Sequence, residues 1–335
     1  MSIAGAMCGK EWTALRLGVA MSRFPHEPFG YGWYQVCHGD SLAKGEVRPF
    51  RAFGHDFVLW RSAMGAPSLL DAHCPHLGAH LGHGGRVDGE RLRCPFHGWI
   101  FDGAGACVAV PYSPDAPLDR RRVVSWPVAQ QGGILFAWWH PRGEAPRFEL
   151  VRLDEPARGE WSRYRRHRWS VASVWQELQE NLVDSAHFRY LHGVQSLPAV
   201  ERFEADGPVL EIKMSQDFMT PRGVQPGFIA TRLAGPYVAS VRFSIGSLAE
   251  IRFVTAVTPI EREGVSLELS FSARLGGIDS PDMSLALIDE VVRQVDQDVV
   301  IWNNKAHWPQ PMLAPGDGPI MRFRRWTEQF SALGD

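Results

Sequence analysis

The feature that most constrains this chain is a pair of short segments that each combine a cysteine with a histidine. Cys74 and His76 form a C-x-H pattern, and Cys94 and His97 form a C-x2-H pattern after 17 intervening residues, 77–93. Two thiolates and two imidazoles on two turns can bind a tetrahedral zinc ion or a two-iron, two-sulfide cluster with two Cys on one iron and two His on the other. The fold must therefore bring two distant turns together.

Several details favour the cluster over zinc. Each turn offers one Cys and one His, whereas zinc sites more often pair C-x2-C with H-x3-5-H. Gly78 and Gly98 follow the two histidines, where the backbone must bend to direct N–H groups at sulfides. His73, His80 and His83 lie nearby but lack the spacing, so we interpret them as loop histidines that are not ligands.

Composition excludes several other classes of protein. Five sparse cysteines in 335 residues are not a disulfide framework, and we interpret Cys8, Cys37 and Cys107 as small buried side chains. A net charge of −2 argues against a nucleic-acid binder held by a global positive field. We find no run of about 18 uncharged apolar residues, so we expect no transmembrane segment and a reducing, cytoplasmic location.

Apolar runs interrupted by glycine and proline predict how the chain is organised. We expect an irregular leader over residues 1–28, a small all-β domain over 29–145 and a second domain over 146–335. The first domain has strand-like runs at 57–60, 68–70 and 134–139. In the second, helical spacing covers 171–191 and 283–305, and strand-like runs cover 209–214, 237–245, 251–259 and 265–273.

A second group of possible metal ligands lies on the first of these helices. His187 and His192 are five residues apart, which separates them by about 140° on a regular helix, so the helix must end or distort between them. Gly193 is suited to the position just after the helix end. Two histidines and one carboxylate with open positions are typical of oxygen-activating non-haem Fe(II). Asp184 shares a helix face with His187 and can orient its imidazole.

The third ligand must be a carboxylate from a distant segment. Asp296 and Asp298 both flank the apolar face of the predicted helix over 283–305, at nearly equal angles. Periodicity does not choose between them, and both can equally be charges at the solvent boundary.

Together these motifs resemble the Rieske non-haem iron oxygenase α-subunits. The resemblance rests on Cys74–His97 and on Asn181-x2-Asp184-x2-His187-x4-His192. It extends to the steroid and sterol branch through Gln297-Asp298-Val299-Val300 and through the segments 317–320 and 323–330. It implies an α+β protein: an all-β Rieske domain, then a catalytic domain with an antiparallel sheet of the helix-grip type.

The resemblance also implies the cofactors and the residues that bind them. A [2Fe–2S] cluster would be held by Cys74, His76, Cys94 and His97. A mononuclear Fe(II) would be held by His187, His192 and Asp298, which selects Asp298 over Asp296. Asp184 and Asn181 would be catalytic residues beside this iron. In a head-to-tail homotrimer, Asp184 would bridge a cluster histidine of a neighbouring subunit, expected to be His97, to His187.

The expected reaction is oxidation of a steroid or sterol by O2, as hydroxylation, desaturation or oxidative demethylation. Electrons would come from NAD(P)H through a ferredoxin or flavin reductase. The pocket should be apolar, with walls from the strands between 209 and 273, and a lipid substrate would allow contact with a membrane surface. The basic run over 163–169 is either a docking site for an acidic electron donor or a solvated strand or intersubunit contact.

Two alternatives remain at this point. The substrate can instead be an aromatic acid or an aryl ether. A non-enzymatic iron–sulfur electron carrier would use only Cys74, His76, Cys94 and His97, but leaves the C-terminal histidine pair unexplained.

Overall fold

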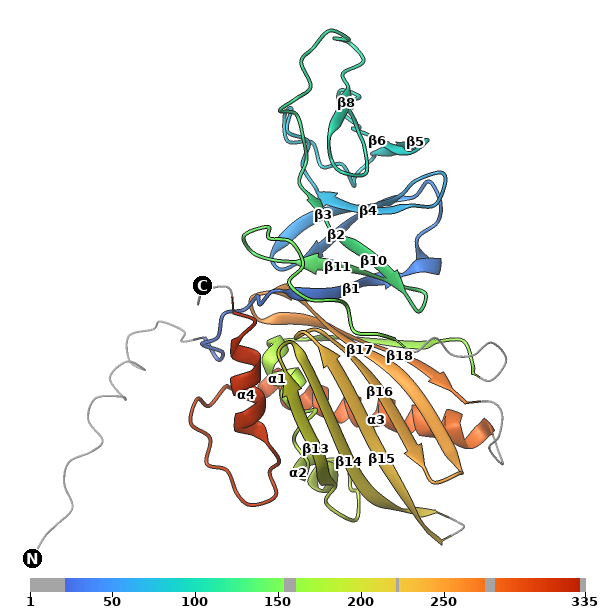
Figure 1. The fold of residues 1–335 in the computed structure, drawn as a ribbon, viewed down its shortest axis with the longest axis vertical. Coiled ribbons are helices and arrows are strands. Elements are labelled where there is room, and N and C mark those ends of the chain that lie inside the picture. The colour runs from blue at the N-terminus through green and yellow to red at the C-terminus, as the bar shows by residue number, and fades with distance from the viewer. Residues whose placement is uncertain (1–21, 154–160, 221–222, 275–280, 332–335) are drawn as a thin grey trace, which may run out of the picture.

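The first part of the chain forms three small antiparallel sheets (Figure 1). The computed structural model describes residues 22–153, 161–220, 223–274 and 281–331. The strand orders are β1-β11-β10, β2-β3-β4-β9 and β5-β6-β7-β8. The strands are β1 (Gly32–His38), β2 (Val47–Ala52), β3 (His55–Arg61), β4 (Pro67–Asp71), β5 (Arg86–Asp88), β6 (Arg91–Arg93), β7 (Ile100–Phe101), β8 (Cys107–Ala109), β9 (Ser125–Trp126), β10 (Val128–Gln131) and β11 (Ile134–Trp139).

These strands form where apolar runs are bounded by turn residues. The predicted strands at 57–60, 68–70 and 134–139 are confirmed within β3, β4 and β11. Every residue of β11 is buried, because β11 is the central strand of its sheet. The turn between β2 and β3 contains Phe53 with a φ of +54°, and the backbone N–H of Phe53 donates to the carbonyl of Pro259 at 2.8 Å. This contact joins the first part of the chain to the second.

The second part is built on one seven-stranded antiparallel sheet in the order β12-β18-β17-β16-β15-β14-β13. Four of its strands confirm the predicted runs: β14 (Val209–Thr220), β16 (Val238–Ile245), β17 (Ala249–Glu261) and β18 (Gly264–Ala273). The others are β12 (Arg165–Val171), β13 (Ala199–Asp206) and β15 (Gly223–Ala234).

Strand β15 is missing from the sequence prediction because Gly223, Pro226 and Gly227 interrupt its pattern. Gly227 has a packing reason: a Cβ there would lie 2.5 Å from the Phe218 ring and from the Ser244 carbonyl oxygen.

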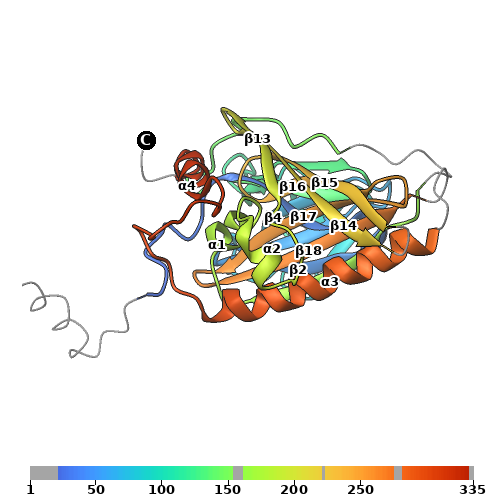
Figure 2. The same ribbon diagram turned by 90° about the horizontal axis from the view of Figure 1, so that it is seen from below.

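Four helices accompany the large sheet: α1 (Trp175–Glu180), α2 (Ala186–Tyr190), α3 (Pro281–Asn304) and α4 (Ile320–Glu328). Figures 1 and 2 show that α3 runs across one face of the sheet, and it contacts β12, β17 and β18. The helix predicted over 283–305 is therefore confirmed. Within the described ranges, no helix is long and apolar enough to cross a membrane.

The continuous helix predicted over 171–191 is wrong. Val171 ends β12, and a turn over 181–183 separates α1 from α2. The break has a local cause: Asp184 Oδ1 accepts the backbone N–H groups of Ala186 and His187, at 3.0 and 3.4 Å. A carboxylate that binds nearby N–H groups begins a new helix in preference to continuing the old one.

One large hydrophobic core joins the two parts of the chain. It contains buried residues from both sides of position 145, such as Leu135 and Leu267, and a smaller core lies under the β5–β8 sheet. The last residues of the predicted leader also contact the second part, since the backbone N–H of His307 donates to the carbonyl of Arg23 at 2.9 Å. The α+β class and the order of the two parts are confirmed, and the boundaries at 28 and 145 stay predictions. Cys8 lies outside the described residues.

Candidate functional site

The two Cys–His segments form two loops with matching hydrogen bonds. The N–H of Gly78 donates to the carbonyl of Cys74 at 2.9 Å, and the N–H of Gly98 donates to the carbonyl of Cys94 at 3.2 Å. Gly78 and Gly98 have φ values of +75° and +73°, a conformation that favours glycine. The predicted bend after each histidine is therefore present, and its cause is local to each loop.

The loops bring the four predicted cluster ligands together. The rings of His76 and His97 lie 4.6 Å apart between centroids, and His76 Nδ1 is buried without a hydrogen-bond partner among the described residues. Cys74 and Cys94 are buried and unbridged. Burial, with a further contribution from the neighbouring Cys94, raises the pKa of the Cys74 thiol to about 12. Such thiols become thiolates readily only beside a cation, so the donor set suits a metal centre.

The edge of this site is apolar and exposed. Trp99 stacks on His76 with 4.7 Å between ring centroids, and its indole N–H donates to Tyr112 Oη at 3.0 Å. Leu77, Phe96 and Tyr112 are each at least 60 % exposed around the loops. The two histidines are half-buried between these side chains and the core.

The neighbouring histidines form a group of their own. The ring of His80 lies 5.2 Å from that of His73 and 4.5 Å from that of His83, and His80 Nδ1 accepts the N–H of Gly82. Burial, followed by the two neighbouring imidazoles, lowers the pKa of His80. Cys37 and Cys107 are buried, and burial raises the pKa of each thiol.

The second group of predicted ligands lies where α2 ends. His187 is in α2, the helix ends at Tyr190, and the N–H of His192 reaches the carbonyl of His187 at 3.3 Å. Gly193 follows with a φ of +77°. The expected helix end between the two histidines is confirmed, with Gly193 two residues after the cap residue Leu191.

A turn from the end of the chain supports this loop. Ser185 Oγ donates to the carbonyl of Gly316 at 2.7 Å. Gly318 has a φ of +83°, and a Cβ there would lie 2.1 Å from the Val183 carbonyl oxygen. The turn formed by Gly316-Asp317-Gly318-Pro319 thus packs directly against the segment that carries the histidines.

Asp298 of α3 completes the group. Single ligand atoms of His187, His192 and Asp298 all lie within 4.8 Å of one another, and His192 and Asp298 are buried. His192 Nδ1 lies 3.0 Å from Gln297 Oε1, which can only accept, so the ring proton is on Nδ1 in the neutral imidazole. The lone pair of Nε2 then faces Asp298 Oδ1 at 3.4 Å. Two acceptors in this position need a proton or a metal ion near them.

The electrostatics of His192 agree with this arrangement. Burial opposes a charged imidazole, but the hydrogen bond and charge of Asp298, together with Gln297, outweigh it and raise the pKa of His192. A proton or a metal ion is therefore favoured between His192 and Asp298.

His187 has the same tautomer as His192. Asn181 Nδ2 lies 3.2 Å from His187 Nε2, which accepts if the amide group donates, and this puts the ring proton on Nδ1. His187 Nδ1 is buried and lies 3.7 Å from Asp184 Oδ2. Burial raises the pKa of Asp184, but His187 and the two backbone N–H groups outweigh burial and lower it. Both imidazoles therefore carry the ring proton on Nδ1 and leave Nε2 unprotonated, the form in which a histidine nitrogen binds a metal. The lone pair of His187 Nε2 faces the Asn181 amide, which must turn away from it when a metal ion binds.

The two candidate carboxylates on α3 lie in different environments. Asp298 is 5 % exposed and faces His192. Asp296 is exposed, and its Oδ1 accepts the indole N–H of Trp169 at 2.7 Å. Only Asp298 joins the two histidines.

Two family models match the chain. The Rieske [2Fe-2S] domain covers residues 32–127, and the 3-ketosteroid 9alpha-hydroxylase C-terminal domain covers residues 137–331. The chain belongs to the Rieske-type oxygenases. Among its relatives, a cholesterol 7-desaturase of Ciona intestinalis is 30 % identical over 328 residues, which cover 90 % of this chain and 68 % of the relative.

Another relative and a solved structure agree with this assignment. The oxygenase component of a 3-ketosteroid-9-alpha-monooxygenase of Rhodococcus rhodochrous is 28 % identical over 90 % of this chain and 82 % of its own. The structure of dicamba monooxygenase bound to dicamba has a TM-score of 0.70 at 22 % identity and covers 90 % of this chain and 97 % of its own. At that identity the structure shows a shared fold.

A cavity of this Rieske-type oxygenase opens beside the histidine–aspartate group. It holds about 820 Å³ of empty space, counting the space at its mouth. The predicted walls between 209 and 273 are present, because β14 to β18 all contribute side chains to the lining. Apolar lining residues from these strands include Met214, Ile229, Val241, Phe243, Phe253, Val257, Leu267 and Leu269.

The basic run of the oxygenase over 163–169 pairs largely within the chain. Arg165 contacts Asp289 at 2.9 Å, Arg166 contacts Asp40 at 2.7 Å, and Arg168 pairs with buried Glu268. These contacts favour a strand with internal ion pairs over a docking site for an acidic donor.

Sequence reasoning missed two side chains at the oxygenase site. Gln297 sets the tautomer of His192, and Trp302 lines the cavity one helical turn after Asp298. Trp302 stands four residues after Asp298 on α3, and that spacing was the available signal. The spacing gave no signal for Gln297, which is the residue directly before Asp298.

Proposed function

We propose that this chain is the terminal oxygenase component of a system that oxidises a steroid or sterol with O2 and electrons from NAD(P)H. The observation that carries the proposal is the convergence of His187, His192 and Asp298 beside an apolar cavity, in a chain that also has a Rieske domain.

Each metal centre has its own set of residues. We assign the [2Fe–2S] cluster to Cys74, Cys94, His76 and His97, because two matching loops place the two histidine rings 4.6 Å apart and the two thiols beside each other. We assign a mononuclear Fe(II) to His187, His192 and Asp298, a histidine pair with one carboxylate. When bound, these metals supply electron storage and O2 activation, while the protein supplies ligand geometry and a dry pocket.

The surrounding side chains hold the ligands in their binding orientation. Gln297 keeps the proton of His192 on Nδ1. Asp184 faces the protonated Nδ1 of His187 and stabilises the same tautomer there, and Asn181 contacts Nε2 on the opposite side of the ring. Loss of such outer partners typically weakens metal binding or activity by about 10- to 100-fold.

The lining of the cavity supports an apolar substrate. Most of its lining side chains are apolar, as in typical ligand pockets. Within the described part of the chain, no lysine or arginine lines it, so the carboxylate of an aromatic acid would find no counter-charge there. The two relatives reported above are named for cholesterol and for 3-ketosteroids, which agrees with a steroid or sterol over an aromatic acid.

The position of the two sites supports electron transfer between subunits. Figure 1 shows the β5–β8 sheet at the opposite end of the molecule from α2. We therefore propose a head-to-tail homotrimer in which Asp184 bridges His97 of the partner subunit to His187. The exposed side chains of Leu77 and Phe96 beside the cluster loops suit such a contact. A ferredoxin or flavin reductase would reduce the cluster.

The proposal is tested by reconstituting the protein with a generic reductase and NADH. A panel of 3-ketosteroids, 3β-hydroxysterols, aromatic acids and aryl ethers is offered, and products are identified by mass spectrometry. We expect three irons per chain and an oxidised steroid or sterol. His187→Ala should keep the visible absorbance of the cluster, fall to two irons and lose turnover.

Other outcomes reject parts of the proposal. Two irons per wild-type chain and no product from any compound would indicate an electron carrier. Oxidation of aromatic compounds alone would overturn the substrate class.

A further inference from the structure

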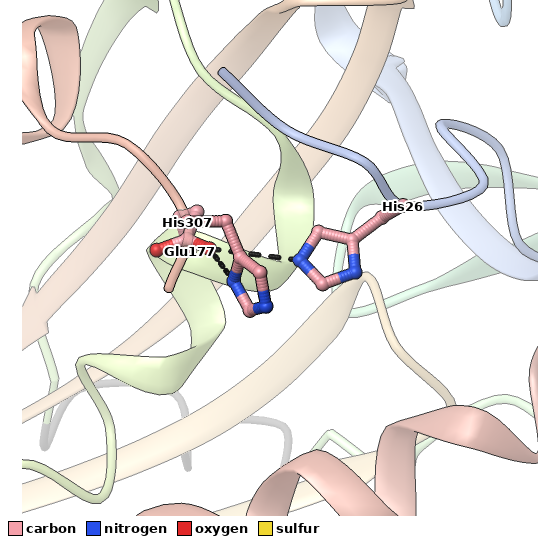
Figure 3. A group of neighbouring side chains, drawn as sticks. All are labelled: His26, Glu177 and His307. Carbon is pink, nitrogen blue, oxygen red and sulfur yellow. Dashed lines mark hydrogen bonds and ion pairs between the residues drawn. The ribbon is translucent and has the colours of Figure 1, made fainter. Parts of the chain in front are cut away.

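A second group of two histidines and one carboxylate lies outside the iron and cluster sites. Figure 3 shows His26, Glu177 and His307 with their side chains pointing toward one another. One ligand atom from each lies within 4.8 Å of the other two. The residues come from three distant segments: the loop before β1, helix α1, and the loop after α3.

The contacts within this group leave one donor atom unused. His307 Nδ1 lies 2.7 Å from Glu177 Oε1. His26 Nε2 lies 3.7 Å from the same oxygen, is buried, and has no hydrogen-bond partner within the described ranges. The two imidazole rings meet edge to face, with 3.9 Å between centroids. An unpartnered buried nitrogen costs free energy, and a cation between it and the carboxylate would remove that cost.

The charge of the surrounding cavity also favours a cation. The adjacent cavity, about 1,000 Å³ counting its open part, is lined by the carboxylates of Glu27, Glu177, Glu180 and Glu328. Two of these have cationic partners: Lys305 lies 2.6 Å from Glu177 Oε2, and Arg324 pairs with Glu180 at 2.5 Å. For Glu27 and Glu328 the described residues provide no ion pair. Four carboxylates against two cations leave a formal charge of −2, which one divalent ion would neutralise.

We propose that His26, Glu177 and His307 bind a divalent metal ion of the zinc type. Imidazole nitrogens and a carboxylate oxygen are ligands that Zn2+ accepts, and water from the cavity would fill the remaining position. Lys305 would keep Glu177 Oε2 and leave Oε1 for the ion. The proposal is independent of the proposed function, because it uses none of the iron or cluster residues.

The position of the site indicates what the ion does. Glu177 is in α1, which leads directly into the segment of Asn181 and His187, and His307 follows α3, which carries Asp298. His307 also contacts the N-terminal segment, since its backbone N–H donates to the carbonyl of Arg23 at 2.9 Å. An ion bound here would cross-link the elements that carry all three predicted iron ligands, and thereby stabilise their relative positions.

The test measures Zn2+ bound to the purified holoprotein, with iron counted in the same sample by mass spectrometry. Zn2+ affinity is measured by competition with a chromophoric chelator. We expect one Zn2+ per chain in addition to the iron. His26→Ala and His307→Ala should each weaken Zn2+ binding by roughly 100-fold or more, because even loss of a ligand's outer partner costs about 10- to 100-fold. Cluster absorbance should not change, because none of these residues lies in the cluster loops.

Two further variants make the test specific. His167→Ala, a half-buried histidine of β12 that is not part of this group, is the matched control and should bind Zn2+ like the wild type. Lys305→Met should tighten Zn2+ binding by roughly tenfold. The substitution removes the repulsion between the lysine ammonium and a divalent ion about 5 Å away, which is worth about this much even at the dielectric constant of water. The proposal is overturned if the wild type binds no Zn2+ at micromolar concentration, if both histidine variants bind it equally well, or if Lys305→Met abolishes binding.

Discussion

The two carboxylates on α3 allow a sharply controlled test of the iron site. Asp298→Ala and Asp296→Ala are identical changes two residues apart on one helix, so effects on helix propensity cancel between them. Asp298 is buried against His192, with 3.4 Å between its Oδ1 and His192 Nε2, whereas Asp296 is exposed and bonds to Trp169. We expect only Asp298→Ala to lose the mononuclear iron.

The structure determines how much the two variants should differ in iron affinity. Removing Asp298 takes away one of three protein ligands. Loss of a side chain that only orients a ligand costs up to about 100-fold in metal affinity, so loss of the ligand itself should cost at least that much, or about 2.7 kcal/mol of iron-binding free energy. Removing Asp296 takes away one indole hydrogen bond at the surface. That loss should cost about 1 kcal/mol of folding free energy and nothing in iron affinity.

The assay counts iron per chain and follows the cluster absorbance, turnover and thermal unfolding of both variants. Asp298→Ala should fall from three irons to two, keep the cluster spectrum and lose turnover by at least about 100-fold. Asp296→Ala should keep three irons and nearly full turnover. If Asp298→Ala retained three irons, or if Asp296→Ala lost one, the assignment of the third ligand would be wrong.

Two other predictions concern the bridge between sites and the junction between the two parts of the chain. Asp184→Asn should keep both metal centres but slow cluster-to-iron electron transfer about 10- to 100-fold in single-turnover experiments, and normal transfer would exclude the bridging role. Burial opposes ionisation of Glu268, but His38 and Arg168 outweigh burial and lower its pKa below the usual 4.5. Ionised Glu268 therefore stabilises the fold above that pH and ceases to do so as the pH falls through the folded-state pKa. Glu268→Gln should lower the free energy of unfolding at neutral pH and flatten its decline below pH 4.5. Denaturant titrations across this range would contradict us if both proteins declined in parallel.

Local sequence was sufficient where the interactions are local. The bends at Gly78 and Gly98 arise from hydrogen bonds to Cys74 and Cys94, four residues earlier in each loop. The C-x-H and C-x2-H spacing therefore predicts the loop geometry without knowledge of the rest of the fold. The same holds for the helix end between His187 and His192, which follows from their five-residue separation.

Helix periodicity failed where a side chain competes with the helix. Apolar spacing over 171–191 predicts one helix, but Asp184 binds the N–H groups that begin α2 and separates it from α1. Strand β15 was hidden for a related reason, since Gly227 is required by the close approach of Phe218 and Ser244 from neighbouring strands. Neither effect is visible in hydrophobic periodicity, because each depends on a specific contact.

The sequence and its family resemblance predicted two sets of metal-binding side chains, an all-β part followed by an α+β part, and an apolar substrate site. Helix periodicity left Asp296 and Asp298 equal, and the family resemblance chose Asp298. The tertiary structure supplied the physical reason, because the docking of α3 on the sheet decides which flank of that helix is buried. Only the tertiary structure brought His26, Glu177 and His307 together, because Glu177 is 151 positions after His26 and His307 is 130 positions after Glu177. Contacts between such distant segments depend on how helices and loops pack, and no short spacing in the sequence records them.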